Sequence, residues 1–458
     1  MTELKGSIVN RTLAVAAGGT FLVLVAFTTP LASLADTAET LHSDPGGQAW
    51  ILSSMSVGLA VALLVSGAVA DDHGRRKVFV AGTVLLALTS VLAAVTPDTL
   101  VLVIARIGQG IGGAAVLSCS LGCIAAEFPA GPRRAHATGV WGASVGAGIA
   151  VGPVVMGLLA VAGSWRAGYW LLAGFAAVLA VVARLTLTEE RADRPRPVDV
   201  TGAVLLGAGL VALLSALVEG RQDWGRPVVT GLFAAAAVLL AAFVLWERRA
   251  RAPMLALGLF RRPEFVASVV AGTATGVGII ALMSFTPTFF QRAFHYTTLD
   301  AALLLLAWSA TSAVVALLAR RLPAGWSARA RIVAGLIVIA AGQLMLTGLD
   351  TGTSALDLLP GLLVAGVGSG VLNAALGQIA VTSVPPGKAS VGSGANNTAR
   401  YVGAALGITI VAVIAAHADR AALIAGWDTA AVVTAALSVA GALLVAATGV
   451  KLRVRVKS

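Results

Sequence analysis

The sequence predicts an all-α membrane protein with fourteen transmembrane helices. Of its 458 residues, 58% are hydrophobic and 12% are charged, whereas about 25% of a soluble domain is charged. A soluble protein with so little polar surface would not stay dispersed. The apolar residues form successive runs of about 20 residues, the length that crosses a bilayer as a helix. Inside lipid, such a run can pair its backbone polar groups only by becoming helical.

These runs follow one another with short connections between them. Their expected ranges are 12–34, 50–70, 78–96, 100–126, 137–162, 169–187, 200–218, 228–246, 265–290, 299–319, 331–349, 358–382, 395–416 and 428–450. The first run is not followed by a small-residue cleavage pattern, so we expect an uncleaved span rather than a signal peptide. Because none of the connections could hold a soluble domain, we expect the function to lie within the helices.

The distribution of positive charge predicts the orientation. Membrane proteins carry an excess of Lys and Arg in their cytoplasmic loops. With a cytoplasmic N-terminus, most of the 32 Lys and Arg residues fall in predicted cytoplasmic segments. The predicted outer segments hold Arg166, Arg221, Arg226, Arg292 and Arg420. We therefore expect an even number of spans, both termini in the cytoplasm and a place in the inner (plasma) membrane. The net charge of +11 then reflects topology, and we expect no nucleic-acid binding.

Two polar segments, from Thr188 to Asp199 and from Glu247 to Glu264, divide the runs into groups of six, two and six. We expect an N-terminal six-helix bundle over residues 1–190. An inserted two-helix hairpin with polar linkers is expected over residues 191–263. A C-terminal six-helix bundle is expected over residues 264–458.

A motif between the second and third spans combines glycines, an acid and basic residues at fixed offsets. It consists of Gly67, Asp71, Gly74, Arg75 and Arg76. Asp71 lies at the C-terminal end of its helix, where the helix dipole disfavours an anion. It therefore needs a partner, either Arg75 or the free N–H groups that begin another helix. We expect Asp71 to reach the backbone near Ser393 to Asn397 when the cytoplasmic side is closed.

The fourth span contains Arg106, Gln109 and Gly110. An arginine inside a span costs several kcal/mol unless it faces a polar cavity. Arg106 and Gln109 are three residues apart and share a helix face, so we expect them to face a cavity. The alternative is that Arg106 extends to the outer interface.

The fifth span carries a pattern of small residues and a proline. Its members are Gly139, Gly148, Gly152, Pro153 and Gly157. Glycines on one face let two helix backbones approach closely. Pro153 removes a backbone hydrogen bond and bends the helix.

Together these motifs resemble the major facilitator superfamily, and within it the fourteen-span drug:proton antiporter family of multidrug and antibiotic exporters. Met156 stands where these exporters usually have a glycine. Asn396, Asn397, Thr398 and Arg400, which enter the thirteenth span, are also similar to this family. The resemblance implies two six-helix bundles that rock around a substrate site near the midplane. It also implies proton-coupled export of small amphipathic compounds such as antibiotics or drugs.

The sequence departs from this family at the group that would carry the proton. Members usually have an aspartate near the middle of the first span, where Phe27 stands here. A buried carboxylate with a raised pKa is the usual proton carrier, and the 21 acids leave no candidate deep in a span. We hypothesise that Asp36 carries coupling; the alternative is an exposed loop acid. The lack of mid-membrane acids makes a dication a poorer substrate than a neutral, anionic or zwitterionic compound.

Aromatic side chains within the spans are candidates to line the substrate pocket, although packing or lipid contact would also explain them. They are Phe27, Trp141, Phe285, Phe289 and Trp308. The five histidines show no metal-ligand spacing, and we expect no metal or cofactor. The expected partners are the bilayer, a small substrate and protons, with the chain as a monomer. Two alternatives stay open: a metabolite importer or facilitator of the same fold, and a polytopic membrane enzyme or sensor.

Overall fold

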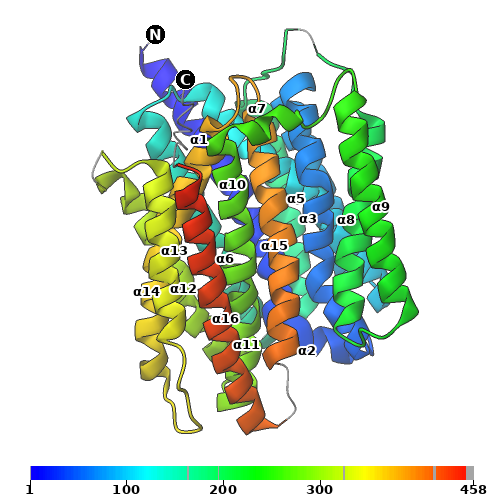
Figure 1. Ribbon diagram of the computed structural model, residues 1–458, viewed down its shortest axis with the longest axis vertical. Coiled ribbons are helices and arrows are strands. Elements are labelled where there is room, and N and C mark those ends of the chain that lie inside the picture. The colour runs from blue at the N-terminus through cyan, green and yellow to red at the C-terminus, as the bar shows by residue number, and fades with distance from the viewer. Residues whose placement is uncertain (1, 162–163, 194, 323–324, 416–418, 450–458) are drawn as a thin grey trace, which may run out of the picture.

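The computed structural model describes residues 2–161, 164–193, 195–322, 325–415 and 419–449, and within these ranges the chain is helical without strands (Figure 1). Thirteen described helical segments are long and apolar enough to cross a membrane. The expected all-α membrane protein is therefore confirmed. The expected run 331–349 forms α13 (Ala328–Leu344), which has 17 residues and is about 25 Å long. It is shorter than the other thirteen and is not counted among them.

The N-terminal part of the chain begins with a helix that is interrupted. The expected span 12–34 is divided into α1 (Thr2–Thr28) and α2 (Pro30–Thr40). Pro30 has no N–H to donate to Ala26, the residue four positions earlier, so the ladder of backbone hydrogen bonds breaks there. The helices that follow are α3 (Pro45–His73), α4 (Arg75–Ala94), α5 (Thr99–Glu127), α6 (Pro132–Val161) and α7 (Trp165–Thr186).

A helical hairpin comes next in the chain. It consists of α8 (Val200–Gly220) and α9 (Pro227–Arg249), which pack against each other. Asp199 caps α8 by accepting from the N–H of Gly202 at 2.8 Å, and it also accepts from Nε1 of Trp246 on α9 at 2.8 Å. The inner helix α8 contacts α3 and α15, while α9 lies at the edge of the molecule (Figure 1).

The C-terminal part contains one long span with an irregular middle. A short helix η1 (Leu257–Arg261) precedes α10 (Pro263–Ala274), the π-helical turn η2 (Thr275–Ile280) and α11 (Ala281–Phe294). Gln343 of α13 donates from Nε2 to the carbonyl of Gly278 within this π turn at 2.7 Å. The remaining helices are α12 (Thr298–Leu318), η3 (Ala319–Arg321), α13, α14 (Ala355–Thr382), α15 (Ala389–Ala415) and α16 (Arg420–Ala447).

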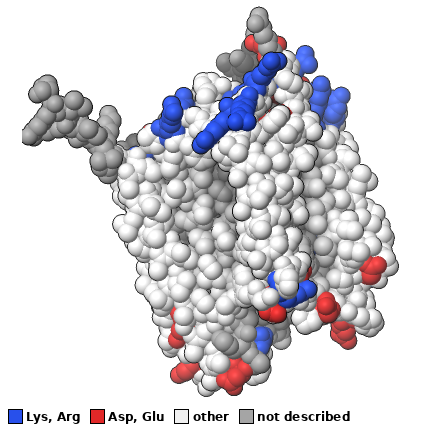
Figure 2. All heavy atoms as spheres, turned by 45° about the vertical axis from the view of Figure 1, so that its right-hand side comes forward, with Lys and Arg blue, Asp and Glu red and all other residues white. Residues whose placement is uncertain are grey.

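Two large apolar clusters form the interior. One consists mainly of side chains from α1 and α3 to α7, and the other mainly of side chains from α10 to α14 and α16. The buried apolar side chains of α15 do not belong to the second cluster, and three of them, Ala389, Tyr401 and Ala405, pack in the first. Helix α1 begins and α16 ends at the same end of the molecule (Figure 1), where basic side chains gather in Figure 2. We call this the basic end; α3 ends there at His73. The opposite end, where α3 begins at Pro45, is called the far end.

Candidate functional site

The carboxylate of Asp71 joins α3 to the N-terminus of α15 at the basic end. Its Oδ1 accepts from the N–H of Ser390 at 3.2 Å and its Oδ2 accepts from the N–H of Val391 at 2.9 Å. Arg75 donates to Oδ1 from Nη2 at 2.8 Å, and both side chains are buried. The contact with a helix N-terminus lies near, but not at, the expected Ser393 to Asn397. Helix α15 begins at Ala389, so its free N–H groups occur several residues earlier than the expected start at 395.

The two glycines of this motif have distinct physical roles. A Cβ on Gly67 would collide with the carbonyl oxygen of Ser390, so a side chain there would push α15 away from α3. Gly74 has φ +125°, a conformation that L side chains rarely adopt. This turn sets α4 so that Arg75 reaches back to Asp71 one helical turn earlier. Arg75 also donates from Nη2 to the carbonyl of Gly387, at 3.3 Å.

A second set of ion pairs surrounds this contact. Asp72 accepts from Nζ of Lys388 at 2.8 Å and from Nη2 of Arg196 at 3.1 Å. These pairs hold the N-terminal side of α15 and the linker before α8 against the end of α3. Arg76 lies 3.5 Å from a carboxylate oxygen of Glu189. All five motif residues thus lie at one junction, where the basic end is closed.

Arg106 of α5 is fully buried and stabilises the break between α1 and α2. It donates from Nε to the carbonyl of Ile51 at 2.9 Å and from Nη1 to the carbonyl of Ala26 at 3.3 Å. The carbonyl of Ala26 is the one that Pro30 deprives of its helical donor. Arg106 also donates to Oε1 of Gln109 at 3.3 Å. In this conformation neither residue lines a described cavity, so their contacts are structural rather than open to a ligand. Its side chain is fully buried, so Arg106 does not extend to the surface either.

Gly110 follows Arg106 by one helical turn and lies directly against α3. A Cβ there would collide with the carbonyl of Met55 and would lie 2.8 Å from the Cα of Gly58. This close approach brings α3 near enough to α5 for its Ile51 carbonyl to receive the guanidinium of Arg106.

The glycines of α6 form close contacts with two different helices, α1 and α12. A Cβ on Gly148 would lie 2.6 Å from the carbonyl oxygen of Phe21 on α1, and one on Gly152 would collide with Oγ1 of Thr28. Gly139 faces the carbonyl of Ala316 on α12 at 3.1 Å, and Gly157 approaches Leu299 more loosely. Helix α6 therefore packs tightly between α1 on one side and α12 on the other. Pro153 lies within the helix beside Gly152.

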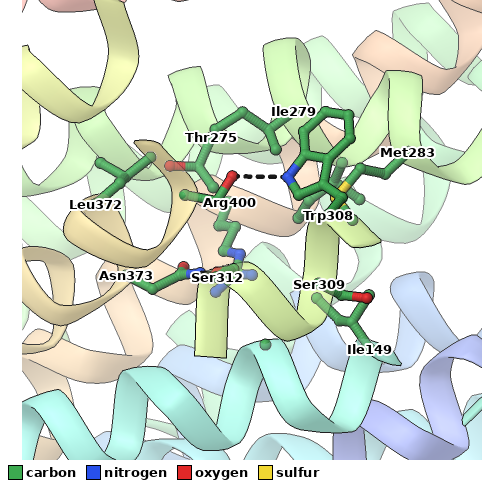
Figure 3. A pocket seen from close by; sticks show the side chains of 13 residues that line it. Ile149, Thr275, Ile279, Met283, Trp308, Ser309, Ser312, Leu372, Asn373 and Arg400 are labelled. Atoms are coloured by element: carbon green, nitrogen blue, oxygen red, sulfur yellow. Dashed lines mark hydrogen bonds between the residues drawn. The ribbon is translucent and has the colours of Figure 1, made fainter. Parts of the chain in front are cut away.

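Two small cavities of about 20 Å³ each lie near the middle of the molecule, and Arg400 of α15 contributes to the walls of both. The first is bounded by α6, η2, α11, α12, α14 and α15 (Figure 3). Its polar side chains are Thr275, Ser309, Ser312, Ser369, Asn373 and Arg400. The second adds α1 through Leu24, Phe27 and Thr28. The cavities thus lie where N-terminal helices meet C-terminal ones.

Arg400 is 3% exposed, and its side chain makes no hydrogen bond or ion pair with any other described residue. Its Nε is buried without a partner. This distinguishes it from Arg106, which is equally buried but saturated by carbonyl oxygens. A charged arginine at mid-span costs about 3 kcal/mol on insertion scales, and such residues usually have a functional role. The unpaired Arg400 is therefore a candidate functional residue.

Two of the five aromatic candidates line a central cavity. Trp308 borders the first cavity and donates from Nε1 to Oγ of Ser369 at 2.9 Å (Figure 3). Phe27 borders the second and packs edge-to-face with Tyr401 at 5.5 Å. Phe289 instead stacks on Trp427 in the apolar interior at 4.1 Å. Trp141 and Phe285 line neither central cavity.

Asp36 lies on α2, is exposed, and lines none of the described cavities. The largest described cavity, of about 400 Å³, lies between α1, α6 and α7. Its walls contain no charged side chain among the described residues. It therefore offers no group that could recognise a charged substrate, and the central cavities are the better candidate site. In the described ranges, no group of three or more His, Cys, Asp or Glu residues could hold a metal ion.

A contact that the motifs did not predict also joins α8, α3 and α15 toward the far end. Arg221, which follows α8, donates from Nε to Oγ1 of Thr409 on α15 at 3.1 Å and from Nη1 to Oγ of Ser53 on α3 at 3.2 Å. Burial lowers the pKa of Arg221 to about 10, so the side chain stays charged at neutral pH. The sequence showed a loop arginine after the seventh run, but gave no signal for its partners.

Comparison with known proteins places this arrangement in context. A sequence model described as Major Facilitator Superfamily matches residues 16–408. The chain is 30% identical to the multidrug resistance protein Stp of Mycobacterium tuberculosis over 394 residues, which cover 86% of this chain and 73% of Stp. It is 31% identical to the puromycin resistance protein pur8 of Streptomyces alboniger, with 81% and 75% covered. It is 28% identical to the tetracenomycin C resistance and export protein of Streptomyces glaucescens, with 90% and 77% covered.

Solved structures of other transporters share the fold, and two of them are compared with the chain. The human organic anion transporter MFSD10 (TETRAN) superposes with a TM-score of 0.67 at 18% identity, covering 95% of this chain and 99% of that one. The proton:xylose symporter XylE, a major facilitator superfamily protein, superposes with a TM-score of 0.69 at 14% identity, covering 96% and 95%. At these identities the likeness concerns the fold alone.

Proposed function

Because the chain belongs to the major facilitator superfamily, we propose that it is a secondary active exporter of small amphipathic compounds such as antibiotics or drugs. The observation that carries this proposal is its similarity, over most of its length, to proteins named for drug resistance and export. The tight packing of α6 against α1 through Gly148 and Gly152 supports it, since this glycine pattern resembles that of the exporting members.

We infer a layout of fourteen spans in two six-helix bundles, with α13 as the short fourteenth span. The two separate apolar clusters support a division into halves. The hairpin of α8 and α9 then forms the inserted pair, within residues 191–263. The basic end faces the cytoplasm in this proposal, because the cytoplasmic ends of membrane proteins are enriched in Lys and Arg.

Transport would proceed by alternating access of a central site to the two sides of the membrane. A drug-sized ligand needs a pocket of about 300–1,000 Å³, far more than either central cavity of about 20 Å³. The described conformation, with contacts across both ends and small central cavities, therefore corresponds to an occluded state. Opening toward the cytoplasm would separate Asp71 from Ser390 and Val391. Opening outward would separate Arg221 from Ser53 or from Thr409.

Coupling to inward proton flow is part of the proposal, with Asp36 as the coupling residue. Since Asp36 is exposed on α2, this role requires α2 to carry it into an outward-open vestibule. The substitution Asp36→Asn tests it directly. If export from the variant keeps the same dependence on the pH gradient, Asp36 has no part in coupling.

The proposed function is tested with everted membrane vesicles that contain the chain. A panel of antibiotics and fluorescent amphipathic dyes is offered with a pH gradient, acidic inside, and again after a protonophore has collapsed the gradient. Accumulation of at least one compound that requires both the chain and the gradient is expected. Lack of accumulation across the panel, or accumulation that the protonophore does not change, contradicts proton-coupled export.

A further inference from the structure

The first central cavity, shown in Figure 3, has one positively charged side chain and no negatively charged one among its described walls. Its lining consists of Arg400, five neutral polar residues and apolar side chains. All acids of the sequence except Glu3 have described side chains, and none of them lines either central cavity. The charge of Arg400 is therefore not balanced within the protein in this conformation.

The other polar groups of the cavity can add donors beside the guanidinium. Ser312 accepts from Nδ2 of Asn373 at 3.4 Å, and Ser369 accepts from Nε1 of Trp308 at 2.9 Å. Among the described residues, neither hydroxyl donates its own proton to a partner, so both protons are available to a ligand. In Figure 3 the Arg400 side chain extends toward Asn373 and Ser312. The cavity thus offers a cluster of hydrogen-bond donors beside the guanidinium of Arg400.

The backbone of Arg400 is held in place by close helix packing. A Cβ on Gly276, in the π turn η2, would collide with the carbonyl oxygen of Arg400. One turn further along α15, a Cβ on Gly403 would lie 2.5 Å from the carbonyl of Thr273. Because α15 and η2 touch backbone to backbone, the backbone that carries Arg400 is held beside the cavity in this conformation. π turns of this kind frequently occur at functional sites.

We propose that Arg400 binds an anionic group of the transported compound, so that the substrate class is amphipathic organic acids, including zwitterions. This inference rests on the proposed export function. The guanidinium and the neighbouring donors would hold a carboxylate, sulfonate or phenolate through charge-assisted hydrogen bonds. Trp308 and Phe27 would border the apolar body of the same compound. The bound anion would supply the partner that Arg400 lacks in the occluded state.

The proposal is tested by binding of three compounds that share one ring system. The probes are 1-naphthalenesulfonate, neutral 1-naphthalenemethanol and cationic 1-naphthalenemethylammonium, titrated into the purified full chain in lipid nanodiscs. The wild type is expected to bind the sulfonate about tenfold more tightly than the alcohol, since a hydrogen-bonded charge contributes more than a neutral group. The ammonium compound should bind most weakly. Equal affinity for the sulfonate and the alcohol would overturn the proposal without any variant.

Variants of the chain test whether Arg400 causes the tighter binding of the sulfonate. Arg400→Gln should abolish it, while Arg400→Lys should retain part of it. Arg184→Gln, which removes an exposed arginine from the last turn of α7, should leave it unchanged. If Arg400→Gln does not yield folded protein, Asn373→Leu replaces it and should reduce the preference. If a folded Arg400→Gln or Asn373→Leu variant still binds the sulfonate more tightly than the alcohol to the full extent, the proposed site is wrong.

Two further comparisons distinguish a substrate site from an inorganic anion site, and failure of the anion site from failure of the export function. Repeating the titrations in gluconate in place of chloride distinguishes a substrate group from an inorganic anion. Chloride binding that depends on Arg400, with equal affinity for all three ring compounds, would overturn the substrate assignment. If the preference holds but everted vesicles accumulate no compound, the export function fails and the anion site stands. If vesicles export compounds but the preference is absent, the anion site fails and the function stands.

Discussion

Asp71 on α3 accepts a hydrogen bond of 2.9 Å from the backbone N–H of Val391 on α15, although the two residues are 320 positions apart in the sequence. The bond places a buried carboxylate at the N-terminus of a helix, where the free N–H groups and the helix dipole favour an anion. It also relieves the unfavourable position of the same carboxylate at the end of its own helix. This contact is the structural basis for the closed basic end.

Replacing Asp71 by Asn should weaken this closure and leave Arg75 without its buried counter-charge. Removal of one partner from a buried ion pair costs about 3–5 kcal/mol, so the free energy of unfolding should fall by about that amount. The vesicle transport rate should also fall, because the proposed alternation requires the basic end to close through this contact. The matched control is Glu264→Gln, because Glu264 pairs with Arg329 at 3.8 Å on the exposed surface and should contribute under about 1 kcal/mol. Equal effects of the two substitutions would argue against a special role for Asp71.

Replacing Arg106 by Gln should destabilise the chain without changing its preference among the charged naphthalene compounds. The substitution removes the donors to Ile51 and Ala26, and each buried acceptor left unpaired costs about 1–3 kcal/mol. Thermal unfolding of the purified variant measures the loss, and the nanodisc titrations measure the preference. Loss of anion preference at unchanged thermal stability would instead assign Arg106 to the ligand site.

Replacing Gly152 by Val should separate α6 from α1 and impair transport. A side chain there meets Oγ1 of Thr28 and the carbonyl of Val25, which belong to α1 and have little freedom to move. Overpacking of this kind costs about 1–3 kcal/mol. Gly174→Val on α7 is the control, since a Cβ at Gly174 meets nothing within 4 Å. Vesicle transport and thermal unfolding, measured side by side, should be affected only by the first substitution.

Replacing Arg221 by Met should favour conformations that are open at the far end. The change removes the hydrogen bonds to Ser53 and Thr409 while keeping an apolar side chain of similar length. With its pKa at about 10, Arg221 is protonated at neutral pH, and its charge is lost as the pH rises above that value. The far end of the wild-type chain should therefore open as readily as that of the variant only in strongly alkaline solution. The distance between spin labels at Glu39 and Ala421, which lie at the far end and take no part in this contact, reports the opening. Arg226→Met, which affects a partly exposed pair with Glu219, should have little effect.

The sequence was informative where a residue carried an unfavourable charge at a known position on a helix. Asp71 required a partner because of its place at the end of α3, and the partner proved to be a helix N-terminus, as predicted. The contact occurs at Ser390 and Val391 because the small polar residues that open α15 are already helical. Their composition does not resemble an apolar span, so the expected start at residue 395 came too late.

The two buried arginines show what the sequence could not decide. Both Arg106 and Arg400 stand within expected spans, and the motif directed attention to Arg106 as the cavity residue. The structure gives Arg106 the carbonyl oxygens freed by Pro30 and leaves Arg400 unpaired beside the cavities. Which arginine finds partners depends on a break in another helix and on the face that each helix presents. The position of the break and the orientation of each helix face cannot be derived from residue spacing along a helix rich in small residues. The π turn η2 also had no signal in the sequence.

The most direct test of alternating access measures both ends of the molecule in one set of samples. Spin labels at Lys77 and Thr382 report the basic end, and labels at Glu39 and Ala421 report the far end, after Cys119 and Cys123 have been replaced by Ala. Distances are measured by double electron–electron resonance at pH 5 and pH 8, with and without a transported compound. The account predicts that conditions which lengthen one distance leave the other short. Two distances that lengthen together, or that never change, would contradict it.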